Sequence, residues 1–294
     1  MNAAVVVGVD GSAYSLDAVA LAAREAVLRD RPLRVVYAFI WPYLGVPLGP
    51  SPFGPPEGGL LGDAQRIVQE AVDRARQAAP TVAVTGAAIT GPSAGVLIDQ
   101  SRSAALVVIG DRGLGGFTGL LAGSVAVQLA AHAACPVMVA RGRPNPAGDV
   151  LVGVDGSPAN EPAIGFAFEE AALRNAPLTA VHAWTYPVST GPGDMLPLVF
   201  DVPEVEAEEA RVLTDALAGW HGKYPDVVVR RELPRAHTRP ALIEAAARAQ
   251  LVVVGSRGRG GFSGLLLGSV SQAVLHHVAC PVVIVPHLAK KDLP

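Results

Sequence analysis

Short apolar runs alternate along the chain with longer stretches in which apolar positions recur every three or four residues. The short runs are rich in Val, Ile and Leu, which is typical of buried strands, and the longer stretches have the period of amphipathic helices. In the first half this pattern predicts strands at 4–9, 33–39, 82–89, 106–109 and 136–140, and helices at 15–29, 63–78, 94–103 and 125–133. Such alternation predicts an α/β fold built from βαβ units around a parallel sheet that is covered on both faces.

The second half repeats the first at a constant offset of 145 residues. VGVDGS occurs at 7–12 and again at 152–157, and the predicted strands recur at 150–154, 178–184, 227–233, 251–254 and 282–285. Each unit is much longer than a solenoid repeat, so the chain contains two copies of a whole domain. We predict a first domain at 1–141 and a second at 150–289. The linker at 142–149, GRPNPAGD, is too rich in proline and glycine for a helix or strand.

Composition excludes several classes of function. The 294 residues are 50% hydrophobic and carry a net charge of -3 without long blocks of one sign, so no nucleic acid partner is expected. Apolar runs are far shorter than the 18 or so residues needed for membrane insertion, and the N-terminus lacks the parts of a signal peptide. We therefore expect a cytoplasmic protein. Cys135 and Cys280 lie far apart in the sequence and have no metal-ligand spacing, which predicts two buried thiols.

Candidate chemistry follows the first and fourth predicted strands of each half. Asp10-Gly11-Ser12 follows the first strand, and the glycine-rich segment GDRGLGGFTGLLAGSV occupies 110–125, with a copy at 255–270. Glycines let backbone amides approach an anion closely, and the amides at a helix start favour phosphate. A Walker A loop would need a lysine before the serine, and a dinucleotide-binding glycine motif would follow the first strand. Neither is present, so a P-loop hydrolase and an NAD enzyme are both disfavoured.

The remaining pattern is Gly110-x2-Gly113-x9-Gly123-Ser124, which recurs from Gly255 and is accompanied in each half by an aspartate after the first strand. In these features the sequence resembles the ATP-binding members of the universal stress protein family, over nearly the whole chain. The resemblance implies two tandem Rossmann-like domains of the adenine nucleotide alpha hydrolase-like type. Each would have a five-stranded parallel sheet in the order 3-2-1-4-5 and about four helices. Family members pair through their fifth strands, which implies an internal pseudo-dimer and leaves room for a homodimer of the whole chain.

The resemblance also assigns site residues. In the first half Asp10 would contact the adenosine, the Ala38 backbone would recognise adenine, and Gly110 would lie against the ribose. Asp155, Ala183 and Gly255 would do the same in the second half. Backbone amides and a serine hydroxyl would hold the phosphates at Gly113, Gly123, Ser124 and Val125, and at Gly258, Gly268, Ser269 and Val270. The implied cofactor is ATP at two sites per chain, with Mg²⁺ held mainly by the phosphates. No catalytic residue and no protein metal site is assigned.

Two structural alternatives stay open for these residues. The glycines could merely permit a tight chain crossing, and the two aspartates could only cap the helices that follow them. Arg112 and Arg257 could supply charge to phosphates or could point to solvent.

The two halves also differ from each other at a few polar positions. The halves differ at Asp111 against Ser256 and at Leu114 against Arg259, so we expect the second half to bind the triphosphate more tightly. His182, whose counterpart is Tyr37, is interpreted as a half-buried structural aromatic rather than a catalytic base.

The resemblance implies an ATP-binding stress-response or growth-regulating protein that acts through an unidentified regulatory partner. The alternative is a slow ATPase or adenylyl-transfer enzyme on the same fold, although no motif supplies a base or nucleophile. A third class, a scaffold that has lost nucleotide binding, is disfavoured by the two complete glycine-rich segments. Two long segments rich in proline and glycine, 41–61 and 185–203, could be lids, partner surfaces or mobile crossovers.

Overall fold

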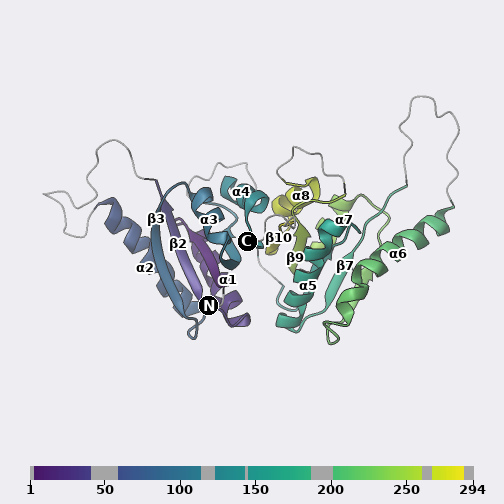
Figure 1. The fold of residues 1–294 in the computed structure, drawn as a ribbon, viewed down its shortest axis with the longest axis horizontal. Helices are drawn as coiled ribbons and strands as arrows, with labels where there is room; N and C mark the ends of the chain where they lie inside the picture. Colours follow the sequence, from purple (N-terminus) through teal and green to yellow (C-terminus); the bar gives the residue numbers. More distant parts are fainter. Residues whose placement is uncertain are drawn as a thin grey trace, which may run out of the picture.

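The computed structural model describes residues 3–40, 59–113, 123–142, 145–186, 201–259 and 267–287. Most of the two long segments rich in proline and glycine lies outside these residues, as do the centres of the two glycine-rich loops. The elements of the first half are β1 (Ala4–Val9), α1 (Ala13–Leu28), β2 (Leu33–Phe39), α2 (Leu60–Ala78), β3 (Val84–Thr90), α3 (Ser93–Ser101), β4 (Ala104–Gly110), α4 (Ser124–His132) and β5 (Val137–Ala140). Figure 1 shows the two halves side by side, each with helices packed on its sheet.

The second half repeats this element order, with one additional short 3-10 helix. Its elements are β6 (Asp149–Gly153), the 3-10 helix η1 (Pro158–Asn160), α5 (Glu161–Arg174), β7 (Leu178–Val181), α6 (Val202–His221), β8 (Val229–Glu232), α7 (Thr238–Ala246), β9 (Ala249–Gly255), α8 (Ser269–His277) and β10 (Val282–Val285). The strands form one sheet in the order β3-β2-β1-β4-β5-β10-β9-β6-β7-β8. Read from the outer edge of the sheet to its middle, each half has the order 3-2-1-4-5, which confirms the α/β prediction.

The sheet separates two apolar layers. Alternate side chains of β1 show this division, because Val5 and Val7 pack with α1 and α2 whereas Val6 packs with α3 and α4. The same division holds in the second half, where α5 and α6 cover one face and α7 and α8 cover the other. Strands covered on both faces need apolar side chains at successive positions, which explains the continuous Val, Ile and Leu runs of the sequence.

Two strands of the second half are shorter than predicted, β8, which covers only Val229–Glu232 of the predicted 227–233, and β7. The sequence predicts a strand at 178–184, but β7 ends at Val181 and Trp184 forms only an isolated bridge with Arg235. His182 and Trp184 still donate their backbone N–H groups to the carbonyls of Glu232 and Pro234. Pro234 has no N–H to donate in return, so the ladder of hydrogen bonds stops there. The residues after β7 are therefore free to line the end of the sheet.

The two halves are joined through their fifth strands, as the resemblance implies. β5 and β10 pair antiparallel, with Val137 opposite Ile284 and Val139 opposite Val282. Arg141, which follows β5, adds a tie to the other half by donating to the carbonyls of Leu275 and His276 at the end of α8. A cation at a helix C-terminus satisfies carbonyls that the helix leaves unpaired.

Four charged side chains form a closed network between α1 and α5, called here the interface quartet. Arg29 pairs with Glu25 in its own half and with Glu170 in the other, and Arg174 pairs with Glu170 and with Glu25. The side chains are 0 to 11% exposed, and burial lowers the pKa of Arg174 while Glu25 opposes that shift. Glu25 and Arg29 are related to Glu170 and Arg174 by the 145-residue offset. The quartet therefore follows the internal symmetry of the chain.

Both cysteines are free and buried, as predicted. Burial raises the pKa of Cys135 to about 12 and that of Cys280 to about 11. The thiolate is the reactive form, so neither thiol should react with iodoacetamide at pH 8 while the chain is folded. We expect two labels per chain only after unfolding in urea, as counted by intact mass. Rapid labelling of the folded chain would contradict this expectation.

The same two thiols predict how stability depends on alkaline pH. A thiol in the unfolded chain loses its proton near pH 8.5, whereas these two keep theirs in the folded chain until about pH 11 and 12. Their contribution to the free energy of unfolding is therefore complete below pH 8.5 and is lost as the pH rises toward 11 and 12. Replacing both by alanine should flatten that alkaline decline in urea titrations, and an unchanged decline would assign it to other groups.

No helix among the described residues has both the length and the apolar character needed to span a membrane.

Candidate functional site

A cavity of about 630 Å³ lies in the second half, where β6, β7 and β9 end and α7 and α8 begin. This volume is within the range of small-molecule sites. β6 lies between β7 and β9, so the direction of the strand order reverses here, which is where open α/β sheets bind ligands. The cavity is lined by Gly153, Val154, Asp155, Asn160, His182, Ala183, Trp184, Thr185, Glu209, Thr238, Arg239, Leu242, Val254, Gly255, Arg257, Gly258, Arg259, Gly268, Ser269, Val270 and Ser271.

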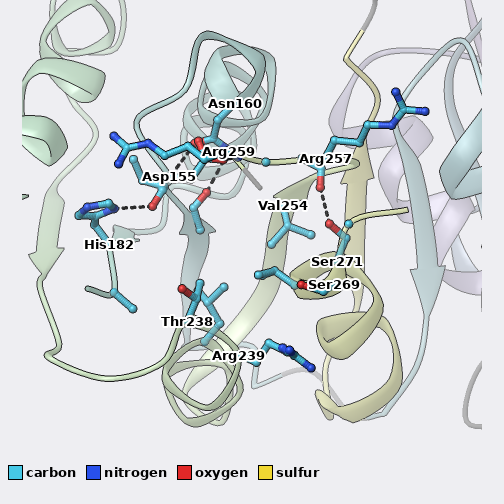
Figure 2. Close-up of a pocket in the computed structure, with 18 of the residues that line it drawn as sticks. Asp155, Asn160, His182, Thr238, Arg239, Val254, Arg257, Arg259, Ser269 and Ser271 are labelled. Atoms are coloured by element: carbon cyan, nitrogen blue, oxygen red, sulfur yellow. Dashed lines mark hydrogen bonds between the residues drawn. The ribbon is translucent and has the colours of Figure 1, made fainter. Parts of the chain in front are cut away.

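All eight candidate residues of the second half line this cavity, and Figure 2 shows several of them. Their counterparts lie at the corresponding places in the first half, except that Ala38 is within a strand whereas Ala183 follows the end of β7. Asp10 follows β1, Ala38 lies in β2, and Gly110 ends β4. Gly123 is the N-cap of α4, and Ser124 and Val125 form its first turn. Gly113 lies beside Asp10, and Arg112 places its guanidinium 5.9 Å from the ring centroid of Tyr14.

The aspartate after the first strand of each half binds the neighbouring loop. Asp155 accepts a hydrogen bond from the Ser157 amide at 2.8 Å and, through its other oxygen, one from the Arg259 amide at 2.9 Å. Asp10 accepts from both the amide and the hydroxyl of Ser12. The N-cap of α1 is Ser12, so Asp10 does not itself cap this helix. Each carboxylate instead fixes the conformation of the chain at the end of the sheet.

These carboxylates explain one glycine of each motif. A Cβ at Gly258 would lie 2.6 Å from Asp155 Oδ2, and a Cβ at Gly113 would lie 2.5 Å from Asp10 Oδ2. The resemblance implies that these glycines hold a phosphate. In the structure each leaves room for the aspartate carboxylate of its own half.

The glycine at the start of the last helix in each half is different, because the fold does not require it. Gly268 has φ -63° and ψ 149°, and Gly123 has φ -66° and ψ 150°, a conformation open to any residue. The nearest atom to an added Cβ is 3.4 Å away at Gly268 and 3.7 Å away at Gly123, which is ordinary contact. Neither helix has a side-chain cap. Among the described residues, no acceptor faces the amides of Ser269 and Val270.

We expect the two kinds of glycine to differ in their effect on stability. Gly258→Ala should lower the free energy of unfolding by about 1–3 kcal/mol, since the new methyl group displaces the Asp155 carboxylate from its loop. Gly268→Ala should change it by less than about 1 kcal/mol, because both space and backbone conformation permit a side chain. Urea unfolding of the two variants without ligand compares them directly. Equal losses would contradict this distinction.

Several polar residues of the cavity were not singled out as ligand-binding residues by the sequence. Asn160 accepts from the Asp155 amide and donates to the Gly153 carbonyl, and Ser271 donates to the Gly255 carbonyl at 2.6 Å. Asn160 and Ser271 replace Ser15 and Ala126 of the first half at the 145-residue offset. Comparing the two halves position by position would have indicated them.

His182 is buried, at 4% exposed, rather than half-buried as predicted. Its Nδ1 lies 2.7 Å from the Val154 carbonyl and its Nε2 lies 2.8 Å from a Glu209 carboxylate oxygen on α6. Both ring nitrogens thus have protein acceptors, and neither is free to take a proton from a ligand. The contacts fit the interpretation of His182 as a structural residue that ties α6 to the end of β7.

The sequence matches the Universal stress protein family over residues 1–141 and again over 147–286. The universal stress protein Rv2623 of Mycobacterium tuberculosis (strain H37Rv) is 40% identical in an alignment 295 positions long that covers 95% of each chain. A universal stress protein of Mycolicibacterium smegmatis is 38% identical in an alignment 291 positions long that covers 96% of each chain. The crystal structure of a universal stress protein from Archaeoglobus fulgidus shares the fold, with a TM-score of 0.69 at 18% identity over 97% of this chain and 98% of that chain.

Proposed function

Since the chain belongs to the universal stress protein family, we propose that each half binds an adenine nucleotide at the carboxyl ends of its strands. The proposed ligand is ATP, with Mg²⁺ held mainly by its phosphates. The observation that carries the proposal is the start of α8. There a glycine that neither backbone nor packing requires adjoins uncapped amides, at the wall of a cavity of about 630 Å³. Helix amides and the positive end of the helix dipole favour phosphate in such a place.

The roles of the other residues follow from their chemistry. Gly268, Ser269 and Val270 would hold phosphate oxygens through their amides and the serine hydroxyl, and Gly123, Ser124 and Val125 would do so in the first half. A carboxylate can accept about four hydrogen bonds, so Asp155 can accept from a ribose hydroxyl while keeping both of its loop amides. Ala183 would offer its backbone to adenine, and Gly255 would lie against the ribose.

The proposed action is regulation rather than turnover. Nucleotide occupancy would change the surface that the protein offers to a regulatory partner in the cytoplasm, which requires that the nucleotide bind two conformations unequally. The alternative of a slow ATPase or adenylyl-transfer enzyme needs a base near the reacting phosphate. His182 is the histidine of the second-half cavity, and both of its ring nitrogens have protein acceptors. This favours the regulatory proposal.

Calorimetric titration of the nucleotide-free chain with ATP and Mg²⁺ tests the proposal. We expect two binding events per chain. Replacing Asp10 and Asp155 together by alanine should weaken both, because each lost charged hydrogen bond contributes about 1.5–3 kcal/mol. Chromatography of the titrated samples reports any conversion of ATP to ADP and so separates the regulatory proposal from the enzyme alternative. No heat with ATP, ADP, AMP or cyclic AMP would refute nucleotide binding.

A further inference from the structure

The cavity of the second half contains an arginine that the first half lacks. Arg239 is the second residue of α7 and lines the cavity. α3 and α7 correspond without a gap at the 145-residue offset, and the counterpart of Arg239 is Ala94, the second residue of α3. The two halves therefore differ by one positive charge at the same place beside their candidate sites.

The protein itself does not neutralise this charge. Among the described residues, Arg239 has no hydrogen bond and no carboxylate partner. Arg239 lies in the first turn of α7, at the positive end of the helix dipole, where a cation is unfavourable. That turn contains no acidic residue that would offset the charge. The carboxylates in the cavity wall are already engaged, Asp155 by loop amides and Glu209 by His182. Arg239 is exposed to solvent, so its charge stays available to an anionic ligand that enters the cavity.

Arg239 lines the same cavity as Ser269, the first residue of α8. In the view of Figure 2 the Arg239 side chain lies on the same side of the cavity as Ser269, whereas the guanidinium groups of Arg257 and Arg259 point away from α8. The side chain of Arg259 lies against Gly156, in the loop that follows Asp155. Arg259 thus lines the cavity near the loop that follows Asp155, and α7 adds a further positive charge, that of Arg239, to the same cavity.

We propose that Arg239 makes the second half selective for adenine nucleotides with two or three phosphates. The inference rests on the proposed function. When α8 holds one phosphate at Ser269, the next phosphate of the chain lies within the region of Arg239, whose planar guanidinium can bind two of its oxygens. AMP has no such phosphate and gains nothing from Arg239. The first half, with Ala94, discriminates less between ATP and AMP.

The test uses the full chain with its first site disabled by Gly123→Val, so that calorimetry reports the second half alone. In this background Arg239→Ala should weaken ATP binding roughly tenfold or more, the size expected for a lost charged hydrogen bond, and should leave AMP binding within about twofold. Arg239→Lys keeps the charge without the planar fork and should give an intermediate loss. Arg248→Ala, at the far end of the α7 segment, removes the same charge from an exposed pair with Glu232 and should leave both affinities unchanged.

The outcomes separate the two proposals. Equal weakening of ATP and AMP by Arg239→Ala, or no weakening of either, overturns the selectivity while nucleotide binding stands. A loss of ATP affinity in Arg248→Ala equal to that in Arg239→Ala also overturns it, because the effect would then be one of net charge. If neither the parent chain nor the Gly123→Val chain binds a nucleotide, although their urea midpoints agree, the proposed function fails, and the selectivity fails with it.

Discussion

Exchanging the charges of the interface quartet in one half, by Glu25→Arg together with Arg29→Glu, is expected to lower the free energy of unfolding by about 3–5 kcal/mol. The exchange keeps an attractive pair within α1 but places like charges against Glu170 and Arg174 of α5. These groups are nearly inaccessible to water, with Glu170 0% exposed, so the repulsion is poorly screened. The measurement is the urea midpoint followed by tryptophan fluorescence. Two of the three tryptophans, Trp184 and Trp220, lie in the second half and report its unfolding.

A rescue provides the matched control. Adding Glu170→Arg and Arg174→Glu restores opposite charges across the interface and should recover most of the lost stability. If the fourfold variant is no more stable than the twofold variant, the loss comes from packing rather than from charge pairing. If the twofold variant unfolds like the parent chain, the quartet does not hold the halves together.

Gly123→Val with Gly268→Val is expected to lower nucleotide affinity by roughly 100-fold or more, because overpacking costs about 1–3 kcal/mol or more and here the side chain would occupy the proposed phosphate position. The fold should persist, since valine readily adopts the backbone conformation of both glycines. Each single variant should retain one binding event per chain in calorimetry. The urea midpoint of the double variant provides the control for folding.

Two results would contradict this second prediction. Unchanged ATP affinity in the double variant would mean that the start of α4 and of α8 does not hold phosphate. Loss of both binding events in a single variant, with an unchanged urea midpoint, would mean that the two halves do not bind independently.

Much of the fold could be predicted from the sequence because local and global signals agree. The continuous apolar run of β4 indicates a strand covered on both faces, and the 145-residue repeat indicates that each half has its own sheet. The early end of β7 could not be predicted from its own residues. It depends on Pro234, which lies in a neighbouring segment and removes a donor that β7 would need.

The candidate site was predictable in part for the same reason. Glycines and an aspartate at fixed spacing mark the ends of strands, but the spacing does not distinguish a glycine that leaves room for the Asp155 carboxylate from one that leaves the cavity open.

The interface quartet could be noticed in the sequence, because Glu25 and Arg29 recur as Glu170 and Arg174. Which charge meets which across the two halves depends on the pairing of β5 with β10. Arg239 is recognised only when it is compared with its counterpart Ala94 and when its guanidinium is seen to have no carboxylate partner among the described residues.

The most direct test of the central claim is mass spectrometry of the small molecules released when the freshly purified chain is denatured, quantified per chain. Nucleotide binding by both halves predicts ATP or ADP at close to two molecules per chain. Failure to find any adenine nucleotide, together with no calorimetric binding of added ATP and Mg²⁺, would contradict the claim and would leave both glycine-rich loops as structural turns.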